Sequence, residues 1–242
     1  MSETPSMSPA DRLYAVRSRI SEAARGSGRN KHDITLIAVS KTHPASAVRQ
    51  LALEGHTDFG ENYLKEAAGK IHELESLSIV WHFIGHIQSN KCSEIAELFD
   101  WVHSVDRLKI ARRLNDAAGQ FGKRLNVLIQ VNIDGEASKS GVSPDQVPDM
   151  VEAIRGFTHL QLRGLMTIPK PSDDPQQARE PYKRLHDLLD AANSQSASVN
   201  GARLDCLSMG MSADLEAAVA EGASHVRIGT ALFGPRHYPA EA

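Results

Sequence analysis

Short apolar runs rich in β-branched residues alternate along this chain with longer segments whose apolar residues recur every three or four positions. The first pattern is typical of strands buried on both faces, and the second of helices that pack one face on a sheet. The clearest run, LNVLIQVNI at 125–133, has a helical segment on each side. The pattern predicts strands at residues 34–39, 56–59, 79–84, 101–104, 125–133, 160–166, 204–209 and 225–228.

An additional helix is predicted before the first strand. Ser8 is suited to cap it, Pro9 to occupy its first position, and apolar residues from Leu13 onward recur at helical spacing. The predicted helices cover 9–25, 44–54, 61–77, 89–99, 106–121, a segment from 143, 175–192 and 212–221, with one helical turn at 231–233. Two of them have candidate N-caps of their own, Asp106 and Ser212.

This alternation favours parallel strands joined by helical crossovers. Two architectures fit it, a closed barrel and an open doubly wound sheet. Eight strands within about 200 residues favour the barrel, and the lack of a GxGxxG motif after the first strand weakens the dinucleotide-binding alternative. We therefore expect an α/β fold, a single (β/α)8 TIM barrel over residues 9–236 with an extra N-terminal helix, between tails at 1–8 and 237–242.

Charge and composition exclude several classes of protein. With 27 Lys and Arg against 30 Asp and Glu, the formal net charge is -3, and no basic run indicates a nucleic-acid partner. No apolar stretch is long enough to span a membrane, and the first residues do not resemble a secretory signal. The two cysteines, Cys92 and Cys206, form no CxxC pair, which fits a reducing cytosol. We expect a cytoplasmic protein.

Polar and glycine residues collect after the predicted strands, where parallel barrels carry their reactive groups. Lys41 begins its loop at the rim of the apolar core, where partial desolvation favours a neutral, nucleophilic amine. The alternative is an ordinary lysine whose ammonium reaches solvent. The polar clusters occupy 40–42, 60–63, 85–90, 132, 138–141, 208–212 and 227–230.

A second signal favours the reactive lysine. Gly229 and Thr230 open the helical turn after the last strand, and with Ser208 at the end of the preceding strand they form a candidate phosphate cradle. Lysine and cradle together suit a Schiff-base aldolase for sugar phosphates or a lysine that carries pyridoxal 5'-phosphate (PLP). Arg227 helps to separate the two, because on the last strand it can project toward the ring nitrogen of PLP. A guanidinium there can only donate, so it keeps that nitrogen unprotonated, and the poorer electron sink disfavours extensive carbanion chemistry. An ordinary ion pair is the other interpretation of Arg227.

Three histidines, His82, His86 and His103, are candidates for a zinc site. Because no carboxylate accompanies them in a recognisable motif, we expect no metal. We expect instead that His82 is packed and hydrogen-bonded and that His86 neighbours the site. Cys206, inside a predicted strand, is expected to be a small buried hydrophobe.

Seven blocks stand in order along the chain: AVSKT at 38–42, FGENY at 59–63, WHFIGHIQSNK at 81–91, SKSG at 138–141, GLM at 164–166, LSMGMS at 207–212 and VRIGT at 226–230. Together they resemble the pyridoxal phosphate homeostasis protein family. The fold of that family is similar to the N-terminal barrel of alanine racemase, fold type III of the PLP enzymes. The resemblance extends from about residue 10 to residue 236.

The resemblance implies a role for each candidate residue. Lys41 would bind PLP as an internal aldimine, and Asn62 would lie near the 3-hydroxyl of the cofactor. Arg227 would face the pyridine nitrogen, and the cradle of Ser208, Gly229 and Thr230 would bind the phosphate. Lys139 would lie near the site without a defined role.

For function, the resemblance implies intracellular vitamin B6 homeostasis and amino-acid and keto-acid balance, without established turnover. Racemases of this fold type take a second acid–base group from an additional β domain, for which we expect no room after residue 236. We therefore expect a monomeric PLP carrier with PLP-dependent apoenzymes as recipients. A PLP-dependent amino-acid racemase or lyase is the main alternative, and a Schiff-base aldolase is the third.

Overall fold

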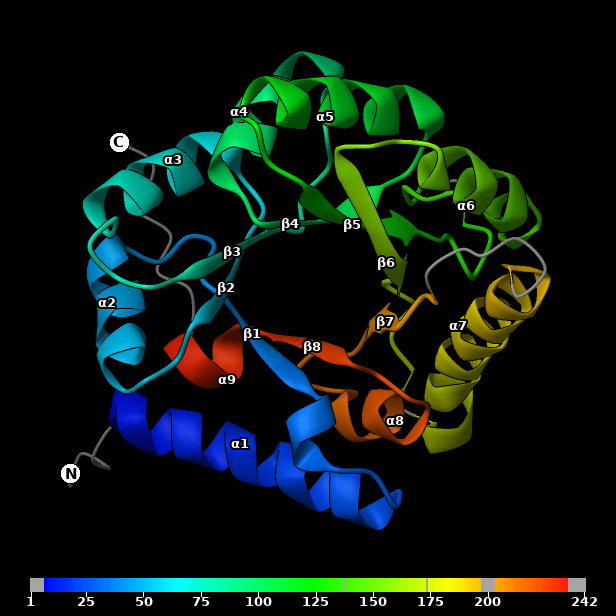
Figure 1. Ribbon diagram of the computed structural model, residues 1–242. Helices are drawn as coiled ribbons and strands as arrows, with labels where there is room; N and C mark the ends of the chain where they lie inside the picture. Colours follow the sequence, from blue (N-terminus) through cyan, green and yellow to red (C-terminus); the bar gives the residue numbers. More distant parts are fainter. Residues whose placement is uncertain (1–6, 137, 173, 197–202, 235–242) are drawn as a thin grey trace.

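The computed structural model describes residues 7–136, 138–172, 174–196 and 203–234, and its strands form one closed parallel barrel in sequence order (Figure 1). The strands are β1 Thr35–Val39, β2 Asp58–Glu61, β3 Val80–Phe83, β4 Trp101–Val105, β5 Leu125–Gln130, β6 Leu160–Met166, β7 Cys206–Ser208 and β8 His225–Ile228. The helices are α1 Pro9–Gly26, α2 Ala45–Leu53, α3 Leu64–Glu73, α4 Cys92–Leu98, α5 Leu108–Gln120, α6 Val147–Arg155, α7 Pro175–Ser196, α8 Leu215–Ala220 and α9 Thr230–Phe233. Short 3-10 helices lie at Lys31–Asp33, Ser89–Lys91 and Pro144–Gln146. The predicted TIM barrel with an extra N-terminal helix is confirmed.

β1 closes the barrel, because it pairs with β2 on one side and with β8 on the other. Ala38 lies opposite Phe59 of β2 and opposite Ile228 of β8, in parallel register in both cases. The carboxyl ends of the strands therefore meet at one end of the barrel, which we call the mouth. Segments from the two halves of the chain become neighbours there.

The extra helix α1 lies against this closure. Its N-terminus has the expected cap, since the Asp11 N–H donates to the Ser8 hydroxyl at 3.1 Å and the Ser8 N–H donates back to the Asp11 carboxylate at 3.2 Å. Arg12 Nε donates to the Leu232 carbonyl of α9 at 2.6 Å. Arg19 of the same helix forms an ion pair with Glu216 of α8 at 2.9 Å, so α1 contacts both α8 and α9 (Figure 1).

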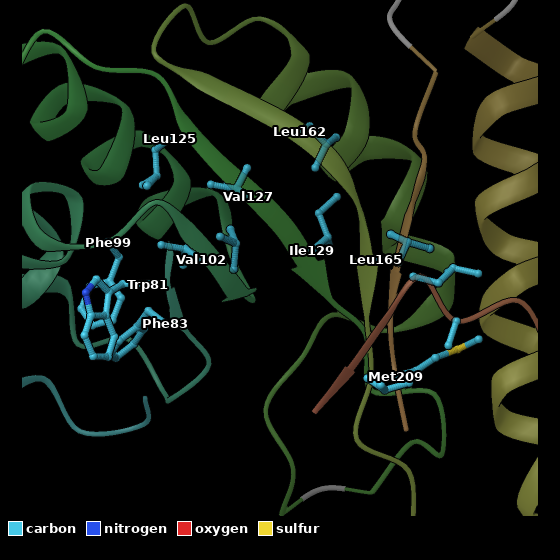
Figure 2. Close-up of a cluster of buried hydrophobic side chains, with 14 of the residues drawn as sticks. Trp81, Phe83, Phe99, Val102, Leu125, Val127, Ile129, Leu162, Leu165 and Met209 are labelled. Atoms are coloured by element: carbon cyan, nitrogen blue, oxygen red, sulfur yellow. The ribbon is translucent and has the colours of Figure 1, made fainter. Parts of the chain in front are cut away.

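The main hydrophobic core lies between the strands and the surrounding helices. Figure 2 shows part of it, with Trp81 and Phe99 close together. A much smaller apolar cluster of Leu128, Met166 and Cys206 lies apart from this core. Cys206 is 3% exposed, so the prediction of a small buried hydrophobe is confirmed. Much of the barrel interior is instead filled by buried polar side chains, namely His82, His103, Ser208, His225 and Arg227.

The predicted boundary between β2 and α3 is wrong. Glu61 was expected to begin a helix, but it ends β2, which starts two residues later than expected, at Asp58. Gly60 pairs with Val39 of β1 and with His82 of β3, and a Cβ at that position would lie 2.8 Å from Ile37 Cγ2, which favours glycine there. Gly60 and Glu61 resemble turn residues in the sequence, yet both pair with β3 and so extend the strand. Helix α3 begins only at Leu64.

Two predicted N-caps are also wrong. Helix α5 begins after Arg107 rather than after Asp106, and α8 begins after Asp214 rather than at Ser212. The Asp214 carboxylate instead accepts a hydrogen bond from the Met211 N–H at 2.6 Å, which tightens the turn before α8. Residues 1–6 of the expected N-terminal tail and the whole tail at 237–242 lie outside the described residues. In the described part of the chain, no helix is long and apolar enough to cross a membrane.

Candidate functional site

The mouth brings Lys41 and the start of α9 together. Because β1 pairs with β8, Lys41 and Thr230 follow neighbouring strands at the same end of the barrel. Gly229 packs closely on β1, since a Cβ at this position would lie 3.3 Å from the Val39 carbonyl oxygen. The predicted reactive lysine and two members of the predicted phosphate cradle are therefore adjacent.

The backbone before Lys41 is held by a buried ion pair. Lys70 Nζ lies 2.6 Å from Glu61 Oε1 and also donates to the Ser40 carbonyl at 2.7 Å. The Ser40 hydroxyl donates to the same Glu61 oxygen at 2.6 Å. Burial raises the pKa of Glu61, and the Lys70 cation and these hydrogen bonds oppose that shift only in part. This cluster fixes the residue that precedes Lys41.

Glu66 holds the residue that follows Lys41. Its Oε1 accepts a hydrogen bond from the Thr42 N–H at 2.6 Å and another from Lys70 Nζ at 2.6 Å. Thr42 has a φ of 66°, a left-handed conformation that is costly for a β-branched residue. Lys41 is half-buried, and its two neighbours, Ser40 and Thr42, are both hydrogen-bonded to side chains of α3. Glu61 lies in the predicted polar cluster 60–63, but the sequence patterns did not single out Glu66 and Lys70, whose spacing of four was the one signal that could have indicated them.

Asn62 and Thr42 present unpartnered oxygens at the ends of β2 and β1. Asn62 Oδ1 and Thr42 Oγ1 are both buried and have no hydrogen-bond partner among the described residues. The Asn62 backbone is pressed against Gly85, where a Cβ would lie 2.0 Å from the Asn62 carbonyl oxygen. Because buried polar atoms are nearly always paired in folded proteins, these two oxygens indicate a place for a ligand.

Arg227 lies beneath the mouth, in the barrel interior. Its side chain is buried, and its Nη1 and Nη2 donate to Ser208 Oγ at 2.7 Å and to the Thr167 carbonyl at 2.9 Å. Burial lowers the pKa of Arg227 to about 10, so the guanidinium remains charged at neutral pH. Because a guanidinium has no acceptor, any ligand atom that it faces must accept a hydrogen bond.

Ser208 lies deeper than a residue of an open phosphate cradle. It is fully buried, and its hydroxyl is 2.8 Å from His103 Nδ1 in addition to the contact with Arg227. Gly229 and Thr230 lie nearer the surface, as the N-cap and the first residue of α9, and Thr230 is exposed. The structure therefore brings all the predicted residues to one end of the barrel but at two depths.

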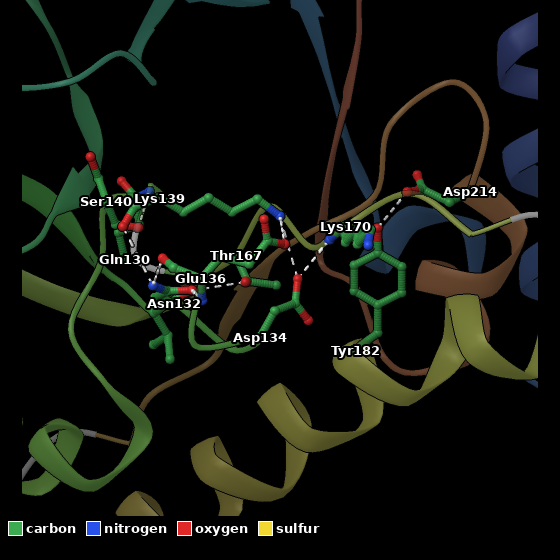
Figure 3. Close-up of polar contacts among 11 residues, drawn as sticks. Gln130, Asn132, Asp134, Glu136, Lys139, Ser140, Thr167, Lys170, Tyr182 and Asp214 are labelled. Carbon is green, nitrogen blue, oxygen red and sulfur yellow. Dashed lines mark hydrogen bonds and ion pairs between the residues drawn. The ribbon is translucent and has the colours of Figure 1, made fainter.

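The loops after β5 and β6 contribute a second polar region (Figure 3). Lys139 lies 3.4 Å from Asp134 Oδ2, which also accepts a hydrogen bond from the Lys170 N–H at 2.6 Å. The His86 ring is largely exposed, with Nδ1 3.4 Å from Ser140 Oγ. Lys139 also lies 2.8 Å from Glu136 Oε1, so it pairs with carboxylates of its own loop, and His86 contacts the same loop.

His82 is packed and hydrogen-bonded, as predicted. Its Nδ1 lies 3.0 Å from His103 Nε2, and its Nε2 lies 3.2 Å from Asp58 Oδ1. Both ring nitrogens are therefore occupied by protein partners. Within the ranges that the structure describes, no group of three or more His, Cys, Asp or Glu side chains is placed to hold a metal ion.

Comparison with known proteins shows relatives along nearly the whole chain. The family model of the alanine racemase N-terminal domain matches residues 12–237. The pyridoxal phosphate homeostasis protein of Pseudomonas aeruginosa is 52% identical over 233 residues, which cover 96% of this chain and 98% of that protein. PipY from Synechococcus elongatus PCC7942 gives TM-scores of 0.84 without PLP and 0.82 with PLP bound, at 36% and 34% identity, over 94% of this chain and 100% of PipY.

A more distant likeness shows the fold alone. An alanine racemase from Clostridium difficile 630 gives a TM-score of 0.71 at 15% identity, over 96% of this chain and 58% of the racemase. The predicted family resemblance is confirmed by the nearer relatives. This chain belongs to the pyridoxal phosphate homeostasis protein family.

Proposed function

We propose that this chain binds PLP through Lys41 and serves PLP homeostasis in the cytoplasm. The observation that carries the proposal is the position of Lys41 beside Gly229 and Thr230, across the β1–β8 pair. A phosphorylated aldehyde needs an amine at one end and hydrogen-bond donors for its anion at the other. The name of the Pseudomonas aeruginosa relative and the PLP bound to PipY support the same ligand.

The residues at the mouth fit this cofactor. Lys41 supplies the amine, and Asn62 offers a buried oxygen without a partner, suited to a ligand hydroxyl. Gly229 and Thr230 supply donors for the phosphate, and Arg227 supplies a fixed donor for the pyridine nitrogen. When bound, PLP provides an aldehyde that condenses with amines and a ring that withdraws electrons. We place Ser208 in the same site, where its hydroxyl holds the Arg227 guanidinium.

We further propose that the protein holds and delivers PLP rather than turning over amino acids. With a pKa of about 10, Arg227 stays a donor at neutral pH and keeps the facing ring nitrogen unprotonated, which weakens the electron sink. Tyr63, in the loop after β2 at the mouth, is 56% exposed, so this part of the mouth lies at the surface. PLP-dependent apoenzymes can reach it, and we expect the carrier to act as a monomer. Cys92 and Cys206 are both free thiols, which fits the cytosol.

Mass spectrometry after borohydride reduction tests this assignment. Protein incubated with PLP and then reduced should carry one pyridoxyl phosphate group on the peptide that contains Lys41. Lys41→Ala should abolish the adduct, whereas Lys65→Ala, at an exposed lysine of α3, should leave it in place. A wild-type protein that takes up no PLP, or an adduct unaffected by Lys41→Ala, would contradict the proposal.

A PLP-dependent amino-acid racemase or lyase remains the second candidate, favoured by His86. Its largely exposed ring, at a loop of the mouth, is a group that could exchange protons with a substrate. This alternative predicts α-hydrogen exchange of free amino acids in deuterated buffer over many turnovers. It also predicts that His86→Gln slows that exchange. Exchange at the rate of free PLP favours the carrier.

A further inference from the structure

A continuous line of hydrogen bonds crosses the barrel interior beneath the mouth. Arg227 Nη1 lies 2.7 Å from Ser208 Oγ, which lies 2.8 Å from His103 Nδ1. His103 Nε2 lies 3.0 Å from His82 Nδ1, and His82 Nε2 lies 3.2 Å from Asp58 Oδ1. The line joins side chains of five strands and ends at a carboxylate.

The two ends of this line lie in different surroundings. Arg227, Ser208 and His103 are all within the closed interior, at 4%, 0% and 0% exposure. Asp58 is the first residue of β2, at the amino ends of the strands, and a quarter of its side chain is exposed. The line therefore leads from the floor of the mouth to solvent at the opposite end of the barrel.

The chemistry of the two end groups gives the line a direction. Arg227 can only donate, and an ionised Asp58 can only accept. With neutral imidazoles, His82 must carry its proton on Nε2 to donate to Asp58, and its Nδ1 must accept from His103 Nε2. His103 Nδ1 then accepts from the Ser208 hydroxyl, whose lone pairs remain for Arg227. In this arrangement each of the four contacts has one donor and one acceptor.

The surroundings keep the His103 imidazole from becoming charged. Burial, assisted by the nearby His82, His225 and Arg227, lowers the pKa of His103 far below its usual value. His225, whose ring centroid is 5.9 Å from that of His103, has its pKa lowered to about 3 by burial and by His82. Burial would raise the pKa of Asp58, but hydrogen bonds from His82 and Thr57 reverse the shift, so Asp58 stays ionised.

We propose that Asp58, His82, His103 and Ser208 form a directional hydrogen-bond relay that positions the Arg227 guanidinium as a fixed donor to the ligand at the mouth. The proposal rests on the proposed function for the identity of that ligand, PLP, and on the geometry alone for the relay. These are positioning residues, because they act on the ligand through Arg227. Burying these polar side chains costs more desolvation free energy than burying apolar ones of similar size. The advantage of the polar line is therefore that it orients Arg227.

The direction of the relay can be measured on the protein without PLP. In ¹⁵N-edited NMR spectra of the imidazole groups, His82 and His103 should both appear as neutral rings protonated on Nε2. In Asp58→Ala, the acceptor at the end of the line is lost, and the His82 ring should lose this single tautomer. A His103 ring protonated on Nδ1 in the wild type would overturn the relay.

Ligand affinity tests the positioning role. His103→Leu should weaken PLP binding about tenfold, because the Ser208 hydroxyl loses its acceptor and Arg227 is no longer fixed. His103→Gln, which retains one donor and one acceptor, should restore part of that loss. His225→Leu is the matched control, because His225 is also a buried histidine of the interior but bonds Ser224 instead of the relay. Equal affinities of folded His103→Leu and His225→Leu would contradict the proposal.

The outcomes separate the relay from the proposed function. If His103→Leu does not fold, Asp58→Ala serves in its place, because the Asp58 side chain is partly exposed and far from the mouth. The Asp58→Ala variant should also bind PLP more weakly than the wild type. If the wild type binds no PLP, the proposed function is wrong, and the NMR result still decides the relay. If PLP binds at Lys41 but the tautomers are reversed, only the relay is wrong.

Discussion

The Lys70 ammonium contacts the Glu61 carboxylate at 2.6 Å inside the wall of the barrel, with 6% and 0% of the two side chains exposed. Removing one partner of such a pair leaves the other charge buried and uncompensated. Lys70→Met should therefore lower the free energy of unfolding by about 3–5 kcal/mol in a urea titration. The double variant Lys70→Met/Glu61→Gln should recover most of that loss.

The same pair should affect PLP binding, because it holds Ser40, the residue that precedes Lys41. The double variant, once folded, should bind PLP more weakly than the wild type, measured by absorbance during titration. Lys183→Met is the control, since Lys183 forms a pair with Asp187 in which both side chains are more than half exposed. If Lys183→Met lowers the free energy of unfolding as much as Lys70→Met does, burial of the ion pair is irrelevant to its effect on stability.

Asn62→Leu should separate stability from ligand binding. Because Asn62 Oδ1 is buried without a partner, its removal should leave the protein as stable or more stable by about 1 kcal/mol, while PLP binding weakens. Asn193→Leu is the matched control, because Asn193 exchanges two hydrogen bonds with the Leu204 backbone and its loss should destabilise the fold. Thermal unfolding and PLP titration give both quantities, and a destabilised Asn62→Leu would mean that Oδ1 has a structural partner.

Gly85 should be intolerant of a side chain. A Cβ there would lie 2.0 Å from the Asn62 carbonyl oxygen, so Gly85→Ala must displace the backbone of the site and should cost about 3 kcal/mol or more. Gly69→Ala in α3 should do the opposite and stabilise the protein by up to about 1 kcal/mol, because nothing lies within 4 Å of its Cβ position. Comparable unfolding midpoints for the two variants would refute the crowding.

Stability should fall as the pH is lowered below neutral. Burial, with His82, lowers the pKa of His225 from 6.5 to about 3, and burial with Arg17 lowers that of His56 to about 4. The unfolded chain therefore binds protons that the folded state excludes, and the stability present above pH 6.5 is lost as the pH falls toward these values. His225 alone should contribute a loss of about 2 kcal/mol at pH 5. The pH dependence of unfolding in His225→Gln should be shallower than in the wild type, and an identical slope would contradict this assignment.

The order of strands and helices could be predicted because each element carries its own periodicity. The predicted bounds of β6 and β8 coincide with the observed ones, and both strands are runs flanked by polar loops. The four-residue strand β2 was misplaced because Gly60 and Glu61 belong to it through their pairing with β1 and β3, although glycine is typical of turns. Local patterns do not contain such contacts.

The candidate site divides in the same way. Lys41, Gly229 and Thr230 were recognisable because they follow strands, and closure of the barrel by the β1–β8 pair brings them together. The depth of Ser208 was not recognisable, because a strand residue gives no sign of which neighbours its hydroxyl will meet inside a barrel.

The alternation of elements, the family and the residues that follow each strand could all be inferred from the order of amino acids, since they depend on short-range patterns. The roles of Lys70, Glu61 and Glu66 around Lys41, and the connection of Arg227 to Asp58 through two histidines, became visible only in the folded barrel. Those contacts join side chains from different strands and helices, and their strength comes from burial, which exists only once the barrel has closed.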